Sequence, residues 1–259
     1  MSTATLSQTE REAFDRDGYL LCRQILDAQT VNALRAAAEK SLHPPLGPLE
    51  LEADVGYPGA PVAADAPGGA TPRRLLHAYS RDAVFRALPH AAAIANRLRG
   101  LMDSETVCLS QNHHNCVMTK FPGFSSRTAW HQDVRYWCFD LPELVSVWVP
   151  LVAEHAGNGV LQFLPGSHRW SLDRGRLDAQ LFLREDLADN QALISKAVGH
   201  ALDPGDVLFF HCRTLHAASA NTAEQIKLSL VYTFHEQSNT PIPGTRSARY
   251  SSILLSLSE

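Results

Sequence analysis

The sequence has few cysteines, no long apolar run and no excess of basic residues. Its five cysteines are odd in number and form no Cys-x-x-Cys pair, which argues against a disulfide framework or a zinc site and indicates reduced, mostly buried thiols. No segment has the length of a membrane span, and the N-terminus is polar, without the apolar core of a signal peptide. We therefore expect a cytoplasmic protein that does not enter a membrane.

The balance of charge is slightly acidic. Lys and Arg number 23 against 27 Asp and Glu, so the formal net charge is −4 and the pI is about 6.3. Such a balance does not indicate nucleic-acid binding. The length of 259 residues suits one large β-rich domain or two small ones, and either can bury a substantial core. No repeat or low-complexity tract marks a boundary, so we expect a single domain over residues 1–259.

The first 104 residues alternate between helical patterns and irregular sequence. Residues 7–16 and 27–40 predict helices with capping residues at their starts, and helical periodicity returns from 74 to about 102. Between them, residues 41–73 are rich in proline and glycine and leave little room for regular structure. So long a connection is typical of a functional or a disordered segment. We interpret residues 1–104 as a helical buttress with an active-site flap.

From residue 105 onward the pattern favours strands. Many short strands with long crossing loops predict an antiparallel jelly roll, the double-stranded β-helix that also serves cupins. The predicted fold class is therefore mainly β with flanking helices, with a jelly-roll core over 105–240 and a C-terminal tail over 241–259. The predicted strands are residues 19–22, 111–120, 144–151, 160–164, 201–203, 207–211 and 227–234.

One short motif offers metal ligands. His131 and Asp133 lie two residues apart, so in an extended segment both side chains point to the same side. His216 follows 85 residues after His131, behind a Pro-Gly-Asp turn and a strand pattern. Two imidazoles and one carboxylate leave three neighbouring coordination positions open, which suits non-haem Fe(II) that binds a cosubstrate and O₂ together. The alternative is a surface His-x-Asp and an unrelated buried histidine.

At these residues the chain resembles the phytanoyl-CoA dioxygenase family of Fe(II)/2-oxoglutarate-dependent oxygenases. The resemblance covers nearly the whole chain and implies Fe(II) held by His131, Asp133 and His216, with 2-oxoglutarate as cosubstrate. The matching pieces occur in the family's order: Phe14-x-x-x-Gly18-Tyr19, Lys120-Phe121-Pro122-Gly123, Trp130-His131-Gln132-Asp133, Val147-Trp148, Asn158-Gly159, Pro165-Gly166-Ser167-His168, Gly205-Asp206, and His216 with Asn221.

The resemblance also implies a cation for the distal carboxylate of 2-oxoglutarate. The family usually has an arginine eleven residues after the second metal histidine, and Lys227 stands there in this chain. Lys227 shares a strand face with Ser229 and Thr233, and a lone ammonium beside a buried pocket needs an anion, which a bound dicarboxylate would provide. The alternative is a solvated lysine at a strand start. Ala218 is a second departure, because the family often has serine there.

Further site residues are expected on either side of the metal motif. Three match family positions that line the cosubstrate pocket: Lys120, Gln132 and Trp148. Three more are candidates for substrate contact: Arg135, Tyr136 and Arg246.

Asp133 bears on the type of reaction. Halogenating relatives have a small residue in place of this carboxylate, so the resemblance implies hydroxylation, or a related oxidation such as desaturation or ring closure, of a small organic metabolite. 2-Oxoglutarate would be decarboxylated to succinate. Two other classes stay open: a cupin-like metal enzyme without 2-oxoglutarate, an isomerase or hydrolase, and a non-catalytic jelly-roll binding module. The substrate and the oligomeric state are not indicated by the sequence.

Overall fold

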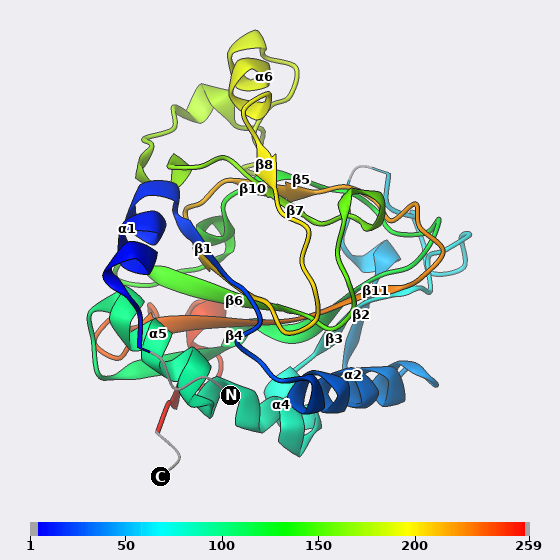
Figure 1. The fold of residues 1–259 in the computed structure, drawn as a ribbon. Helices are drawn as coiled ribbons and strands as arrows, with labels where there is room; N and C mark the ends of the chain where they lie inside the picture. The colour runs from blue at the N-terminus through cyan, green and yellow to red at the C-terminus, as the bar shows by residue number, and fades with distance from the viewer. Residues whose placement is uncertain (1–4, 58, 257–259) are drawn as a thin grey trace.

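Two antiparallel sheets lie face to face (Figure 1), as seen in the computed structural model, which describes residues 5–57 and 59–256. The larger sheet has the strand order β1-β9-β6-β11-β4-β3-β2, with β12 also paired to β4, and the smaller has the order β5-β10-β7-β8. This arrangement confirms the predicted jelly roll. The strands are β1 (Tyr19–Cys22), β2 (Leu49–Leu51), β3 (Pro72–Leu76), β4 (Val107–Lys120), β5 (Thr128–His131), β6 (Leu144–Pro150), β7 (Leu161–Phe163), β8 (Val198–Gly199), β9 (Val207–His211), β10 (His216–Ala218), β11 (Lys227–Glu236) and β12 (Ile253–Leu254).

The two N-terminal helices begin at residues whose side chains cap them. Ser7 Oγ accepts from the Glu10 amide at 3.2 Å and Glu10 Oε2 accepts from the Ser7 amide at 2.7 Å, while Asp27 Oδ1 accepts from the Thr30 amide at 2.7 Å. The two predicted N-terminal helices are thereby confirmed. The α-helices are α1 (Gln8–Asp17), α2 (Ala28–Leu42), α3 (Ala78–Arg81), α4 (Ala83–Ala87), α5 (Ala92–Met102) and α6 (Ala188–Ile194). The 3₁₀ helices are η1 (Glu52–Asp54), η2 (Leu88–His90), η3 (Asp133–Tyr136), η4 (Ala156–Asn158), η5 (Ser167–Arg169), η6 (Arg174–Arg176) and η7 (Arg246–Ala248).

The larger sheet has two different faces. Helices α2, α4 and α5 lie against its outer face (Figure 1) and enclose the main hydrophobic core, to which β11 contributes Leu228, Leu230 and Tyr232. The alternate residues of β11 face the smaller sheet, and Val231 packs there in a second core. Lys227 lies on this inner face, as its position in the strand predicts.

The N-terminal part supplies strands as well as helices. β1, β2 and β3 belong to the larger sheet, so the interpretation of residues 1–104 as a helical buttress and flap is incomplete. Residues 74–76 were expected to be helical and instead pair with 116–118 of β4. This segment is a strand because it forms backbone hydrogen bonds with the edge of β4, and such pairing in a sheet overrides the local helical propensity. The expected strand at 201–203 is reduced to one bridge between Leu202 and Glu154.

The proline-rich segment 41–73 is more regular than expected. It contains β2 and η1, and Glu52 of η1 is fully buried where it meets Arg73 at 3.1 Å. The Ser126 hydroxyl also donates to Glu52, at 2.7 Å. A buried ion pair therefore fixes this segment to the sheets beside the site described below. Within residues 5–57 and 59–256, no helix is both long and apolar enough to cross a membrane.

Candidate metal centre

Strand pairing brings the two predicted histidine ligands together. β5 and β10 are antiparallel neighbours with His131 opposite His216, and the ring centroids are 4.3 Å apart. His131 Nδ1 lies 2.8 Å from the Ala129 carbonyl and His216 Nδ1 lies 2.9 Å from the Thr214 carbonyl. Because a carbonyl only accepts, each Nδ1 carries the proton and each Nε2 keeps a free lone pair, the arrangement found in metal-binding histidines.

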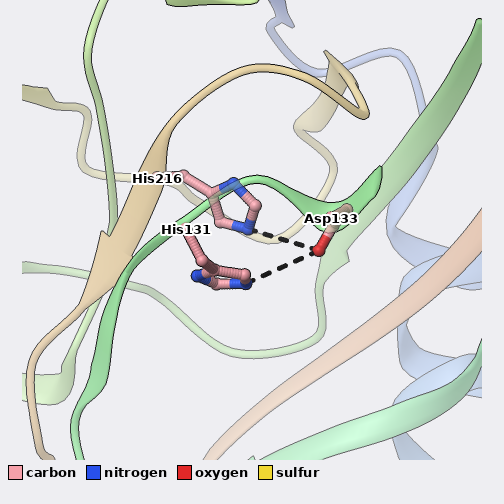
Figure 2. A group of neighbouring side chains, drawn as sticks. All are labelled: His131, Asp133 and His216. Atoms are coloured by element: carbon pink, nitrogen blue, oxygen red, sulfur yellow. Dashed lines mark ion pairs between the residues drawn. The ribbon is translucent and has the colours of Figure 1, made fainter. Parts of the chain in front are cut away.

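Asp133 completes the group from a different element than expected. The strand ends at His131 and Asp133 begins the 3₁₀ helix η3, while Gln132 between them keeps extended backbone with φ −107° and ψ 137°. The carboxylate still reaches the histidines, because Oδ1 lies 3.6 Å from His131 Nε2 and 3.7 Å from His216 Nε2 (Figure 2). The candidate ligand atoms of the three residues lie within 4.8 Å of one another, and all three side chains are buried.

The charges at this point fit a divalent cation. Burial opposes ionisation of Asp133, but His114, His216 and His131 outweigh it and hold the pKa of the carboxyl well below its usual range. Burial, reinforced by His131, lowers the pKa of His216 to about 4. At neutral pH Asp133 is therefore a carboxylate and His216 a neutral imidazole. Asp133 Oδ1 accepts no hydrogen bond from the residues described, which leaves a buried anionic oxygen for a metal ion to satisfy.

The three residues lie on the wall of a cavity between the sheets. Of the other predicted site residues, Lys120, Trp148, Lys227 and Tyr136 line it. The sequence interpretation did not identify several further lining residues: Tyr57, Arg73, Arg74, His114 and Thr128. A second cavity adjoins the first at Tyr57, Arg74, His114 and Tyr136, and Arg246 lies on its wall.

Two expected residues lie outside both linings. The Gln132 side-chain amide donates to the Arg213 carbonyl at 2.5 Å, and Gln132 is absent from the walls of both cavities, so its expected place in the cosubstrate pocket stays a prediction. Arg135 is also absent from the walls. The Arg135 guanidinium carbon lies 3.6 Å from the centroid of the Phe182 ring and 4.3 Å from that of the Tyr136 ring. Arg135 therefore packs against Tyr136, which itself lines the cavity.

Lys227 already has an anionic partner. Its Nζ lies 2.9 Å from Glu154 Oε2 and donates to the Gly159 carbonyl at 2.6 Å. Glu154 is itself fixed, since Trp148 Nε1 and Ser229 Oγ donate to its Oε1 at 2.8 and 2.6 Å. Lys227 is 2% exposed and Glu154 1%. The sequence reasoning treated Lys227 as a lone ammonium that only a ligand could neutralise, and that premise was wrong.

Lys120, unlike Lys227, has no carboxylate partner among the residues described. Its Nζ donates to the carbonyls of Ser126 and Ser219, at 2.9 and 2.7 Å, and no carboxylate of the described residues forms an ion pair with it. Burial lowers the pKa of Lys120 well below its usual value, and Arg73 and Lys227 lower it further. Gly159 lies against this side chain with φ +79°, where an added Cβ would stand 3.0 Å from Lys120 Cδ. Glycine is therefore required beside the lysine.

Some of the cavity residues that were not predicted had a signal in the sequence, and others had none. His114 lies in the strand predicted over 111–120, an even number of residues before Lys120, and both line the cavity, so the signal was present. Arg73 and Arg74 lie in a segment interpreted as loop and helix, and their ion pairs with Glu52 and Glu50 depend on β2 pairing with β3. Glu154 lies 73 residues before Lys227, and no local pattern joins the two.

A jelly roll that directs two imidazoles and one carboxylate to a single point inside a cavity defines a mononuclear non-haem metal oxygenase. The chain belongs to the phytanoyl-CoA dioxygenase family, whose model matches residues 14–229. The resemblance seen in the sequence is thereby confirmed. The protein is an Fe(II)/2-oxoglutarate-dependent dioxygenase, and its cofactors are Fe(II) and 2-oxoglutarate.

Individual relatives agree with this membership. The ectoine dioxygenase of Sphingopyxis alaskensis is 27% identical over 235 residues, which cover 84% of this chain and 72% of the relative. The ectoine dioxygenase of Bordetella bronchiseptica is 26% identical over 258 residues, 92% of this chain and 78% of the relative. The solved structure of the carbocyclase SnoK from nogalamycin biosynthesis has a TM-score of 0.75 at 20% identity and covers 99% of both chains. That similarity shows the fold.

Proposed function

We propose that this dioxygenase hydroxylates a small polar metabolite. The observation that carries the proposal is the carboxylate of Asp133 beside the Nε2 atoms of His131 and His216 on the wall of a cavity between the sheets. With all three protein ligands present, three coordination positions remain for a cosubstrate and O₂, and none is vacated for a halide. Bound Fe(II) and 2-oxoglutarate supply the oxidising chemistry, in which 2-oxoglutarate is decarboxylated to succinate.

The protein's own residues position and shield this chemistry. The Ala129 and Thr214 carbonyls hold the two imidazole rings in the metal-binding tautomer. Lys120, Trp148 and Lys227 line one side of the cavity and form the proposed cosubstrate end. Buried walls exclude water, which protects a reactive centre from side reactions.

The second cavity is the proposed substrate end. It is lined by charges of both signs, because Arg246 and Asp54 face it together with the Arg74–Glu50 ion pair, whose atoms are 2.9 Å apart. Arg246 has no ion-pair partner among the residues described and is exposed. Tyr136 and Trp137 add aromatic surface. These features favour a small metabolite with both a carboxylate and a cationic group, and they agree with the ectoine dioxygenases among the relatives.

An anaerobic titration followed by turnover tests this function. Protein, Fe(II) and 2-oxoglutarate without O₂ should give a visible charge-transfer absorption, and O₂ with the substrate should give succinate and a hydroxylated product in equal amounts. A cupin-like isomerase or hydrolase would convert substrate without consuming 2-oxoglutarate. A chlorinated product in excess chloride would contradict the proposal.

Amide exchange in residues 41–73 should fall when cosubstrate and substrate bind. Tyr57 of this segment lines both cavities, and its hydroxyl lies 3.3 Å from that of Tyr136, so a ligand between the cavities would pack against it. A segment of this kind commonly closes over bound ligands. Hydrogen exchange followed by mass spectrometry, with and without both ligands, checks this, and unchanged exchange over 41–73 would rule out a flap.

The affinity for 2-oxoglutarate should fall as the pH rises through the lowered pKa of Lys120. Below that pKa the ammonium attracts a carboxylate, and above it the neutral amine does not. The charged groups around it are Arg73, Lys227, Glu52 and Glu154. Above the pKa, affinity should drop about tenfold for each pH unit. Isothermal titration with Mn(II) in place of iron measures this, and Lys120→Met should bind weakly at every pH. A wild-type affinity that stays constant up to pH 10 (roughly the ordinary lysine value) would contradict the assignment.

A further inference from the structure

The cavity beside the metal centre has four cationic side chains on its wall, and three of them are already neutralised. Arg73 pairs with Glu52, Arg74 pairs with Glu50 and Lys227 pairs with Glu154. Among these four, only Lys120 has carbonyl oxygens and no carboxylate as its partners. The charge available to a dicarboxylate is therefore smaller than the number of cations indicates.

Glu154 is positioned to hold Lys227 permanently. Its Oε1 receives two hydrogen bonds, from the Trp148 indole and the Ser229 hydroxyl, and both donors lie on strands of the larger sheet. Its amide donates to the Leu202 carbonyl at 2.8 Å and its own carbonyl accepts from the Leu202 amide at 2.9 Å, so the backbone is fixed as well. A carboxylate fixed on both sides does not swing away from the lysine without breaking these bonds.

We propose that Glu154 is a specificity-determining residue for the cosubstrate: it occupies Lys227, so that the distal carboxylate of a 2-oxo acid is held by Lys120 alone. The inference rests on the proposed cosubstrate end of the cavity. It makes Glu154 an internal competitor of the bound dicarboxylate. Because Glu154 holds Lys227, the distal carboxylate of 2-oxoglutarate does not form a charge-assisted hydrogen bond with this second cation. The preference of the enzyme for 2-oxoglutarate over a 2-oxo acid without a distal carboxylate is therefore smaller than it would be if both lysines were free.

The test is the substitution Glu154→Gln, which keeps a carbonyl for Trp148 and Ser229 and removes the charge. Binding of 2-oxoglutarate to the protein loaded with Mn(II) is measured by isothermal titration, so that no turnover is needed. The affinity should rise by about tenfold or more, because Lys227 gains the ligand carboxylate as its partner. 2-Oxopentanoate, which has the same reacting end and no distal carboxylate, should bind with unchanged affinity.

Two further variants test whether the change in affinity comes from the loss of any carboxylate or from the release of Lys227. Glu185→Gln deletes a carboxylate that pairs with Arg127 at the surface, 2.7 Å away, and should leave both affinities unchanged. The double substitution Glu154→Gln with Lys227→Met replaces the buried ion pair by neutral groups and should keep the affinity for 2-oxoglutarate within about threefold of wild type, because Lys227 contributes little while Glu154 holds it.

Each outcome supports or overturns the inference. A rise with 2-oxoglutarate alone in Glu154→Gln supports it, and so does retained affinity in the double variant if the single variant does not fold. An unchanged or weaker affinity in Glu154→Gln, or a loss of tenfold or more in the double variant, overturns it. If wild-type protein with either metal binds no 2-oxoglutarate, the proposed cosubstrate itself fails, which is a distinct result.

Discussion

Substitution of His131 or Asp133 by alanine should abolish Fe(II)-dependent turnover and leave the fold intact. Each change removes one of the three proposed metal ligands and leaves only two protein donors for the ion. The loss should be large, a factor of about 10³ or more, which corresponds to about 4 kcal/mol of lost stabilisation of the reaction. Iron content per chain and succinate formation measure the two effects.

The fold control follows from the burial of the site. Asp133 Oδ2 accepts one hydrogen bond, from the Ser146 hydroxyl at 3.4 Å, and Oδ1 accepts none from the residues described, so removal of the carboxylate breaks few contacts of the fold and should not unfold the protein. Circular dichroism of Asp133→Ala should therefore match wild type. Gln132→Ala, next to both ligands and outside the cavity walls, is the matched control and should keep its iron. Full iron loading and full activity in His131→Ala would disprove the assignment of the metal centre.

Lys227→Ala should be strongly destabilising. The substitution leaves the Glu154 carboxylate buried, with two hydrogen bonds and no counter-charge. Breaking one side of a buried ion pair typically costs about 3–5 kcal/mol, a large part of the total stability of a domain. Urea unfolding at pH 7 measures the change. A loss of stability below about 1 kcal/mol would show that Glu154 finds water or another partner when the lysine is absent.

The control for this prediction separates charge from packing. Replacing both members, by Glu154→Gln with Lys227→Met, removes the two charges together and keeps similar side-chain volumes. Exchanges of this kind are often close to neutral, because the desolvation cost disappears with the attraction. Arg35→Ala, which breaks an exposed pair with Glu39, should cost less than about 1 kcal/mol. The order of the three stabilities is the expected result.

The sequence predicted those features that local patterns carry. Strand alternation placed Lys227 on the face toward the cavity, and capping residues marked the starts of the two N-terminal helices. The three candidate metal ligands could be proposed because two of them lie close in the sequence and the third lies in a motif of its own. The same reasoning could not find Glu154 or β3, because the role of each is decided by a partner far away in the chain.

The pairing of β1 with β9 has a consequence for how the chain folds. Tyr19 lies opposite Phe210, so the first strand of the larger sheet is completed only by one of the last. Contacts between residues that lie so far apart in the sequence form slowly, because the chain must lose much conformational entropy before the two residues meet. During synthesis the N-terminal strand has no partner until most of the chain has emerged from the ribosome. His131 and His216 likewise meet late, so we expect iron to bind a nearly finished fold.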